Sequence, residues 1–260
     1  MEQIGTFPFG KPVRMVKQED CTPKRVFVLG VYSSAVHARW EDSNGNEIVK
    51  ALAVDSEPYI FWRGDGAEAI IQRVIVPDKF GKLRAADQQF NGPSGSALDA
   101  CFLKPLGLNR ADGWLCDLVP HSCSNPSQQG AIYRAYKKCA EVYNLPTATV
   151  PPVPSRLPKE RLDTILGEIN QSQARVLILL GDLPIKWFLF HFDKRWQRLS
   201  DFGKESWSYG QLHAVEIGDR KMQVLPLAHP RQVAKLGKSS SIWYLLHQDW
   251  CDESAHGLIG

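Results

Sequence analysis

Short apolar runs that stop at a glycine, a proline or a polar cluster recur along the chain and predict buried strands. Such runs occupy residues 25–30, 114–120, 175–181 and 223–230. Helical periodicity lies between them, over residues 97–108, 128–143 and 157–171. Strands that alternate with helices are typical of right-handed βαβ units, which build a parallel sheet covered on both faces. We therefore expect an α/β fold whose strand ends gather along one edge, where ligands of open α/β sheets bind.

Three segments interrupt this alternation. Residues 41–89 are long and mixed, with a possible strand pair and a Gly-Asp-Gly turn, so we interpret them as an insertion or lid rather than a second core. Residues 147–158 are rich in proline and predict a stiff, extended connection. Residues 213–227 place a Gly-Asp turn between two alternating runs, which predicts a β-hairpin. We expect one domain over residues 1–260, with the divergent insertion at about 41–89.

Composition narrows the class of protein without fixing its partner. The chain has 260 residues and a formal net charge of +3, from 31 basic and 28 acidic side chains, which permits nucleic-acid binding without indicating it. Six cysteines are scattered without a Cys-x-x-Cys pair, which favours reduced thiols over a disulfide framework or a zinc site. No apolar signal segment precedes them and the longest apolar runs are of strand length, so we expect a cytoplasmic protein without a membrane span.

Two stretches are candidates for chemistry. The segment VFVLGVYSSA begins as an apolar strand, and we expect a sharp turn at Gly30 that places Tyr32, Ser33 and Ser34 beside a ligand. Hydroxyl groups orient a water molecule or bind a phosphate, but they are poor bases without a carboxylate or an imidazole nearby. Phe90 directly precedes the glycine-rich turn NGPSG. An aromatic ring at such a turn serves either as a core residue or as a platform for a planar ligand.

The order of motifs along the chain is more specific than any one of them. A strand ending in glycine is followed by FNGPSGSALD, LGLNRADGWLCDLVP, RVLILLGDLPIKWFL and LPLAHP. This succession resembles the uracil-DNA glycosylase superfamily, particularly its branches with a phenylalanine-x-glycine-x-x-glycine stretch. The resemblance extends from residue 25 to about residue 250, and residues 41–89 match it poorly. It implies a three-layer αβα sandwich with a four-stranded, mostly parallel central sheet.

The resemblance assigns roles to three residues. Members of that family extrude a nucleotide from DNA, hold the flipped base by stacking and hydrogen bonds, and break its N-glycosidic bond. Phe90 occupies the position that resembles the stacking aromatic, and Gly30 lies where the floor of the base pocket is expected. His229, in the sequence AHP, resembles the family's histidine, whose imidazole stabilises negative charge on the leaving base.

The chain departs from the family where an acidic or amide side chain usually positions the attacking water. The places that follow Gly30 hold Val31, Tyr32, Ser33 and Ser34. Tyr32 and Ser33 are therefore the catalytic candidates at this strand end. Three carboxylates elsewhere are possible substitutes, although each is more simply interpreted as a turn or cap residue: Asp55, Asp87 and Asp99.

Asp117 marks a second departure, because the family places an asparagine near the end of this strand to read uracil. An amide offers a donor and an acceptor, whereas an ionised carboxylate only accepts hydrogen bonds. Asp117 would suit a base edge that presents amino or N–H donors, as in carboxylate pairing with cytosine N4. A carboxylate protonated through desolvation would regain a donor. The alternative is an aspartate that caps the following turn, and both interpretations stay open.

The stretch after His229 reads RQVAKLGKSSS, where the family often continues with serine and proline. Basic side chains at spacings suited to phosphates, an apolar wedge and a neutral donor make five residues candidates for DNA binding: Arg231, Lys235, Leu236, Lys238 and Ser239. A solvated basic loop is the alternative. His121 stands where iron–sulfur branches of the family have a cluster cysteine, so we expect neither a cluster nor another metal.

We interpret the chain as a DNA base-excision glycosylase-like protein that hydrolyses the N-glycosidic bond of a flipped uracil-like or other damaged base. This hypothesis expects a monomeric, monofunctional enzyme without a cofactor, acting on double- or single-stranded DNA, with Phe90, Asp117 and His229 around one cavity. The alternative is a catalytically inactive member of the fold that binds nucleic acid or a nucleobase. Other hydrolases and nucleotide-binding enzymes are not indicated, because G-x-S-x-G, G-x-x-x-x-G-K-[ST] and strand-following G-x-G-x-x-G motifs are absent.

Overall fold

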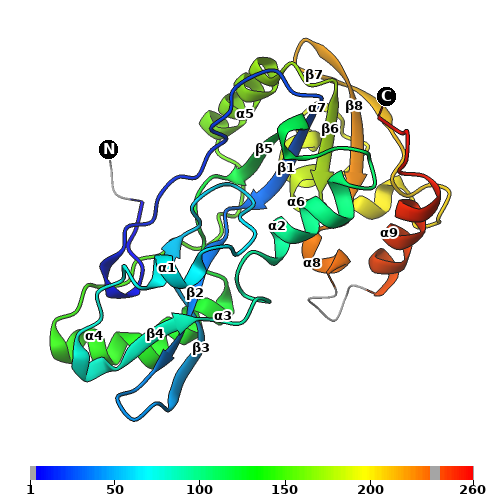
Figure 1. Cartoon of the computed structure of the whole chain (residues 1–260). Helices are drawn as coiled ribbons and strands as arrows, with labels where there is room; N and C mark the ends of the chain where they lie inside the picture. Colours follow the sequence, from blue (N-terminus) through cyan, green and yellow to red (C-terminus); the bar gives the residue numbers. More distant parts are fainter. Residues whose placement is uncertain (1–3, 235–240, 260) are drawn as a thin grey trace. The chain divides into compact units, whose positions relative to one another are not determined.

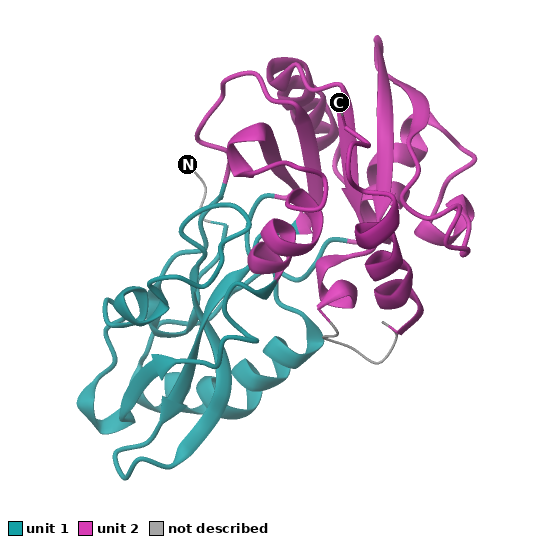
Figure 2. Cartoon of the chain, turned by 45° about the vertical axis from the view of Figure 1, so that its right-hand side comes forward, with its two compact units in different colours: residues 1–16, 32–93, 120–154 teal, residues 17–31, 94–119, 155–260 magenta. Residues whose placement is uncertain are grey.

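The computed structural model describes residues 4–234 and 241–259. The chain divides into two compact units, each assembled from three separate segments (Figure 2). Unit 1 consists of Met1–Val16, Tyr32–Pro93 and Pro120–Pro154, and unit 2 of Lys17–Val31, Ser94–Val119 and Ser155–Gly260. Each unit is built around a sheet of its own. The single domain over residues 1–260 stays a prediction.

Unit 2 contains a five-stranded sheet in the order β5-β1-β6-β8-β7 (Figure 1). β1 pairs in parallel with β6, and β6 pairs in parallel with β8, whereas β7 is antiparallel to β8. The α/β class and the four strands expected from the apolar runs are confirmed. The prediction of four strands in the sheet is wrong by one, because β7 adds an edge strand. The strands are β1 (Val26–Tyr32), β5 (Gly113–Val119), β6 (Val176–Leu180), β7 (His213–Ile217) and β8 (Arg220–Leu227).

The additional strand comes from the hairpin expected over residues 213–227. A two-residue turn at Gly218 and Asp219 joins β7 to β8. Gly218 has a φ of 59°, and two-residue hairpin turns require such positive values, which glycine adopts without steric cost. The hairpin prediction is confirmed.

The central strands of unit 2 are apolar along their length because both faces of the sheet are covered. All residues of β6 are buried, and β1 is buried from Val26 to Val31. Continuous apolar runs of this kind are typical of the middle of a parallel sheet. The turn expected at Gly30 is wrong, since β1 continues through Gly30 to Tyr32. The chain leaves extended structure sharply at Gly181, the residue after β6, which has a φ of 90°.

The helices of unit 2 agree with the helical periodicity, with shifted ends. The helix expected over residues 97–108 begins at Pro93 and ends at Leu103. Proline suits the first turn, because the N–H that it lacks would have no partner within the helix. The helix expected over residues 157–171 is α5, which buries Ile165 and Ile169 at i, i+4 spacing. The segments are α2 (Pro93–Ala97) with π-helical turns at Leu98–Leu103, α5 (Lys159–Ser172), α6 (Asp182–Pro184) with π-helical turns at Ile185–Leu189, α7 (Phe190–Phe192), α8 (Pro230–Val233) and α9 (Ser241–Glu253), with short 3-10 turns at Arg110–Asp112 and Leu199–Phe202.

Unit 1 contains a three-stranded antiparallel sheet in the order β3-β2-β4. Its longest helix, expected over residues 128–143, begins at Pro126 and ends at Tyr143. The elements are β2 (Ala35–Glu41), β3 (Glu47–Ser56), β4 (Lys82–Ala85), α1 (Ala67–Ile71), α3 (Pro126–Ala131) with π-helical turns at Ile132–Lys137, and α4 (Lys138–Tyr143), with 3-10 turns at Pro8–Gly10 and Asp78–Phe80.

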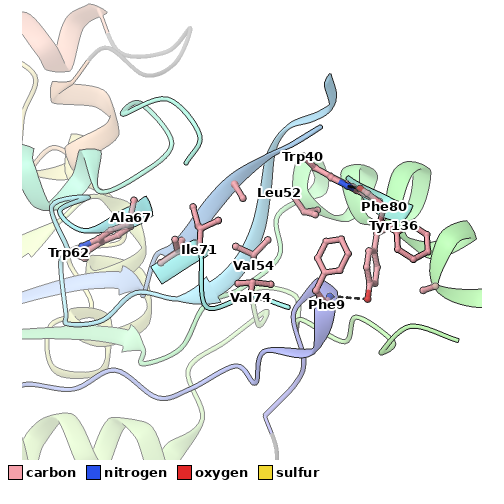
Figure 3. Close-up of a cluster of buried hydrophobic side chains, with 13 residues drawn as sticks. Phe9, Trp40, Leu52, Val54, Trp62, Ala67, Ile71, Val74, Phe80 and Tyr136 are labelled. Atoms are coloured by element: carbon pink, nitrogen blue, oxygen red, sulfur yellow. Dashed lines mark hydrogen bonds between the residues drawn. The ribbon is translucent and has the colours of Figure 1, made fainter. Parts of the chain in front are cut away.

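A buried cluster joins the N-terminal segment, the sheet and the long helix of unit 1 (Figure 3). Phe9 contacts Trp40 and Tyr136 edge to face, with ring centroids 5.3 and 5.0 Å away. The Phe9 N–H also donates to Tyr136 Oη at 2.9 Å. Leu52 and Val54 from β3 belong to the same cluster. Residues 41–89 therefore contribute to a hydrophobic core of unit 1, which corrects their interpretation as a lid without a core.

Within residues 4–234 and 241–259, no helix is long and apolar enough to cross a membrane. No group of three or more His, Cys, Asp or Glu side chains in the same residues is placed to hold a metal ion. All six cysteines are free thiols.

Candidate functional site

His229 lies directly beyond the carboxyl end of β8, which pairs with β6 and β7 in the unit 2 sheet. The last ladder residue, Leu227, is buried, and its carbonyl accepts a hydrogen bond from the Gly181 N–H at 2.8 Å. Ala228 is also buried, and His229 is the first partly exposed residue after the strand. The ends of β6 and β8 therefore fix the place at which the imidazole leaves the sheet.

The His229 side chain caps the short helix α8. The imidazole Nδ1 accepts a hydrogen bond from the Arg231 backbone N–H at 3.1 Å. The backbone N–H of His229 donates to Gln232 Oε1 at 3.0 Å. Because Nδ1 is an acceptor, the proton of the neutral ring is on Nε2. Nε2 has no hydrogen-bond partner among the residues that the structure describes. The cap thus leaves one N–H donor for a ligand.

Burial keeps this imidazole neutral. Desolvation, with a smaller contribution from the charge of Arg231, lowers the pKa of His229 to about 4. At neutral pH the ring is therefore an uncharged donor. A fixed donor of this kind stabilises negative charge that develops on a ligand atom more strongly than mobile water does.

Gly181 gives the imidazole its space. A Cβ at this position would lie 2.9 Å from the Cβ of His229, which is closer than real contacts allow. The backbone of Gly181, with φ 90° and ψ −173°, is also one that other residues avoid. The positions of Gly181 and His229 are therefore coupled through direct contact.

Gly181→Ala is expected to displace His229 and to destabilise unit 2. Gly218→Ala is the matched control, because Gly218 also has positive φ but a Cβ there would meet nothing within 4 Å. The control should lose about 1 kcal/mol from its backbone alone and leave the His229 imidazole resonances unchanged. Gly181→Ala should shift those resonances and lose more stability in urea denaturation. Unchanged His229 resonances in Gly181→Ala would show that the contact does not fix the ring.

Asp117 lies inside β5, two residues before the strand ends at Val119, and its side chain is 4% exposed. Its backbone is clamped from α5. Arg161 donates to the Asp117 carbonyl at 2.6 Å and to the Leu118 carbonyl at 3.2 Å, and its other N–H group pairs with Glu168 at 3.0 Å. The helix therefore holds the end of β5 rigidly. A rigid strand end suits a residue that reads a ligand, and the base-binding role of Asp117 stays a prediction, as does that of Gly30.

Tyr32, Ser33 and Phe90 belong to unit 1, whereas Gly30, Asp117 and His229 belong to unit 2. Tyr32 is the last residue of β1, and Ser33 is buried between β1 and β2. Their catalytic roles stay predictions. The convergence of Phe90 with Asp117 and His229 around one cavity likewise stays a prediction.

Phe90 lies in a loop that packs closely against the backbone of the turn at Gly64. The neighbouring Asn91 is buried, and its side chain accepts from the His37 N–H at 2.8 Å and donates to the His37 carbonyl at 2.9 Å. A Cβ on Gly92 would lie 2.1 Å from the backbone nitrogen of Gly64, so the two glycine turns cross without room for side chains. The Phe90 ring is partly exposed rather than buried, with Lys50 Nζ 5.9 Å from its centroid. This exposure favours a platform over a core residue.

The three substitute carboxylates are all engaged in ion pairs. Asp55 accepts from Arg14 at 3.0 Å, Asp87 from Arg39 at 2.7 Å and Asp99 from Arg110 at 2.7 Å. Each arginine occupies a carboxylate oxygen that a general base would need for the proton of a water molecule. The ion pairs give each of the three carboxylates a structural role and weaken the case for each as a general base.

A buried carboxylate that the sequence did not single out lies next to the first motif. Glu57 follows β3 and is 2% exposed. Its N–H donates to the Ser34 carbonyl at 3.4 Å, and its Oε2 accepts from the Trp62 N–H at 3.3 Å. The signal in the sequence is only that an acidic residue follows the last apolar stretch of a strand. The pairing of β3 with β2 brings it beside Ser34.

Four of the five DNA-binding candidates lie outside the described residues, namely Lys235, Leu236, Lys238 and Ser239. Arg231 is described and its side chain is exposed in the first turn of α8. An exposed guanidinium two residues from His229 is available for a phosphate. A scan against protein-family models and a search of curated proteins found no match to this chain.

Proposed function

We propose that the chain is a DNA base-excision glycosylase-like protein that hydrolyses the N-glycosidic bond of a flipped uracil-like or other damaged base. The observation that carries the proposal is His229, a neutral imidazole fixed at a strand end with its Nε2–H available. The order of motifs in the sequence and the shared α/β class add support. The finer expectations, a three-layer sandwich of the uracil-DNA glycosylase type, a monomer and a cytoplasmic location, belong to the same proposal.

The protein contributes to this reaction by positioning the substrate and by stabilising the charge that develops on the leaving base. Water adds to the anomeric carbon of the sugar and loses a proton to bulk water, while the bond to the base breaks and its electron pair leaves with the base, which takes up a proton from bulk water after release. A hydrogen bond from His229 Nε2 to the departing base stabilises this negative charge. The pKa of about 4 means that His229 holds no imidazolium proton to transfer at neutral pH, so the neutral ring acts only as a hydrogen-bond donor. Phe90 is proposed to stack on the flipped base.

Asp117 is proposed to select the base. A carboxylate accepts hydrogen bonds, so it favours a base edge with an amino or N–H donor, whereas an amide also offers a donor to a carbonyl. Well-placed pairs of this kind are worth about 1–3 kcal/mol of discrimination between bases. The proposal therefore places ordinary uracil behind another damaged base in the preference of the wild-type chain.

Asp117→Asn is expected to raise the release of uracil relative to the other lesions by about tenfold or more. Release is measured under single-turnover conditions from oligonucleotides carrying uracil, hypoxanthine, xanthine or mismatched thymine. Asp219→Asn, in the exposed turn between β7 and β8, is the control for the same loss of charge. Unchanged ratios in Asp117→Asn would remove Asp117 from base recognition and assign it to the structure of β5.

A binding protein without hydrolysis is the second candidate, favoured by the lack of a carboxylate from Val31 to Ser34. Hydroxyl groups alone are poor bases, so water would be activated weakly at this strand end. Tight binding of lesion-containing DNA, with no base released from any substrate, would decide for this candidate. Release of a base that is lost on replacing His229 would decide for the enzyme.

A further inference from the structure

A buried hydrogen-bonded chain lies directly behind His229 in unit 2. The N–H of Ala228, the residue before His229, donates to Tyr209 Oη at 2.8 Å. Tyr209 Oη is 2.7 Å from His247 Nδ1, and His247 Nε2 is 2.8 Å from the Cys101 carbonyl. Tyr209 is 2% exposed and His247 is 1% exposed. Four segments far apart in sequence thus meet at the backbone that carries the imidazole.

The protons in this chain have one consistent arrangement. The Cys101 carbonyl can only accept, so His247 Nε2 carries a proton, and in a neutral ring Nδ1 is then an acceptor. The Tyr209 hydroxyl therefore donates to His247 Nδ1 and accepts from the Ala228 N–H. Burial favours the same state, because desolvation lowers the pKa of His247 to about 4 and raises that of Tyr209. Every polar group in the chain is paired.

The turn that supplies Tyr209 is itself fixed. The next residue, Gly210, accepts a hydrogen bond from Trp250 Nε1 at 3.1 Å, and a Cβ on Gly210 would lie 2.4 Å from that indole nitrogen. The His247 ring packs against Phe102 with centroids 4.5 Å apart. Helix α9 therefore holds both Tyr209 and His247, and neither side chain has space to adjust.

Each residue of the segment Leu227–His229 is held by at least one hydrogen bond of its backbone. Gly181 N–H binds the Leu227 carbonyl, Tyr209 Oη binds the Ala228 N–H, and Gln232 binds the His229 N–H. Ala228 is the first residue beyond the β6–β8 ladder, so its N–H would be unpaired and buried without Tyr209. The hydroxyl of Tyr209 supplies the hydrogen-bond acceptor that a neighbouring strand would provide within the ladder.

We propose that Tyr209 and His247 are positioning residues that fix the orientation and the Nε2–H tautomer of His229. The catalytic consequence rests on the proposed function, whereas the structural consequence does not. A misplacement of about 1 Å at a reacting group costs up to about 100-fold in rate. Loss of the Tyr209 hydroxyl leaves the Ala228 N–H free to rotate away, and the contact between His229 Nδ1 and the Arg231 N–H loosens with it.

Tyr209→Phe tests the proposal with a change of one oxygen atom. Imidazole ¹⁵N resonances of His229 should change from one Nε2–H tautomer to a mixture of both tautomers. The single-turnover rate of base release should fall about 10- to 100-fold, with DNA affinity changed by less than about threefold. Tyr133→Phe is the matched control, because Tyr133 is exposed in unit 1 and should leave both readouts unchanged.

Three further variants separate positioning from general loss of stability. Ile165→Val removes one buried methyl group from α5 and leaves Tyr209, His247 and Trp250 in place, so it should destabilise unit 2 without altering the His229 tautomer. His247→Asn keeps an acceptor near Nδ1 for the Tyr209 hydroxyl and should preserve more of the wild-type His229 signal than His247→Phe.

Wild-type His229 resonances in Tyr209→Phe would overturn the positioning role, whatever the activity. The same result would follow if Ile165→Val altered the tautomer as strongly as Tyr209→Phe. A wild-type chain that releases no base would instead count against the proposed function, and the resonances would still decide the positioning role.

Discussion

His229→Asn is expected to lower the rate of base release about 100- to 1000-fold while leaving the chain folded. Asparagine is a favourable N-cap, so its side chain can still accept from the Arg231 N–H and keep α8 in place. Its shorter side chain cannot present a donor where the imidazole Nε2 lies. The variant therefore separates the capping role of His229 from its proposed role as donor to the leaving base.

The rate is measured under single-turnover conditions, next to a urea denaturation curve for each variant. His191→Asn is the control, since His191 is exposed at the end of the helix that follows β6. The control should match the wild type in both measurements. A His229→Asn chain that retains the wild-type rate would show that the imidazole is a cap and nothing more.

Acidification from about pH 6.5 to about pH 4 is expected to destabilise the folded chain by several kcal/mol. Burial lowers the pKa of three histidines to about 4, namely His37, His229 and His247. Between their unfolded value near 6.5 and that folded value, the unfolded chain binds protons that the folded chain does not. The folded state therefore loses stability as the pH falls through this window, by on the order of 3 kcal/mol for the buried His247 and by less for the partly exposed His37 and His229.

Urea denaturation at a series of pH values measures this loss. His247→Asn should reduce the dependence on pH in the window, because it removes one buried imidazole. Carboxylates with lowered pKa, such as Asp193 and Asp201, lose their stabilising contribution only below about pH 4, so the two effects separate. A flat stability between pH 6.5 and pH 4 would show that these rings are hydrated or already charged in the folded state.

The sheet of unit 2 was predictable because its signal is local. Apolar runs such as β6 are continuous in sequence, and the hairpin of β7 and β8 is marked by its Gly218 turn. The turn assigned to Gly30 failed because a glycine in an apolar run does not reveal its φ. Gly30 continues a strand, whereas Gly181 adopts a positive φ. The sequence pattern is the same in both places.

Unit 1 was harder to predict because its core is built from distant segments. Phe9 reaches Tyr136, which is 127 residues away, and no periodicity links the two. The residues of the candidate site also differ in whether a local sequence pattern marks them. His229 was found from the short motif AHP. Tyr209 and His247 were missed because no local pattern links Tyr209 to Ala228, 19 residues away, or to His247, 38 residues away.

Glu57 was missed for a related reason. It follows a strand whose pairing with β2 cannot be read from composition, and its burial depends on that pairing. Conversely, the sequence offered Asp55, Asp87 and Asp99 as candidate bases, and their ion pairs became visible only when the chain was folded. Residue type is local information, whereas the partner that sets its chemistry is not.

Mass-spectrometric quantification of free base, together with a count of abasic sites, tests base excision by this chain most directly. The wild-type chain is incubated with oligonucleotides that each carry one lesion, and His229→Asn is treated in parallel. Base excision through His229 predicts equal amounts of free base and abasic site from at least one oligonucleotide, with both products forming about 100- to 1000-fold more slowly with the variant. Binding of the DNA without free base or abasic sites from any of them would contradict it.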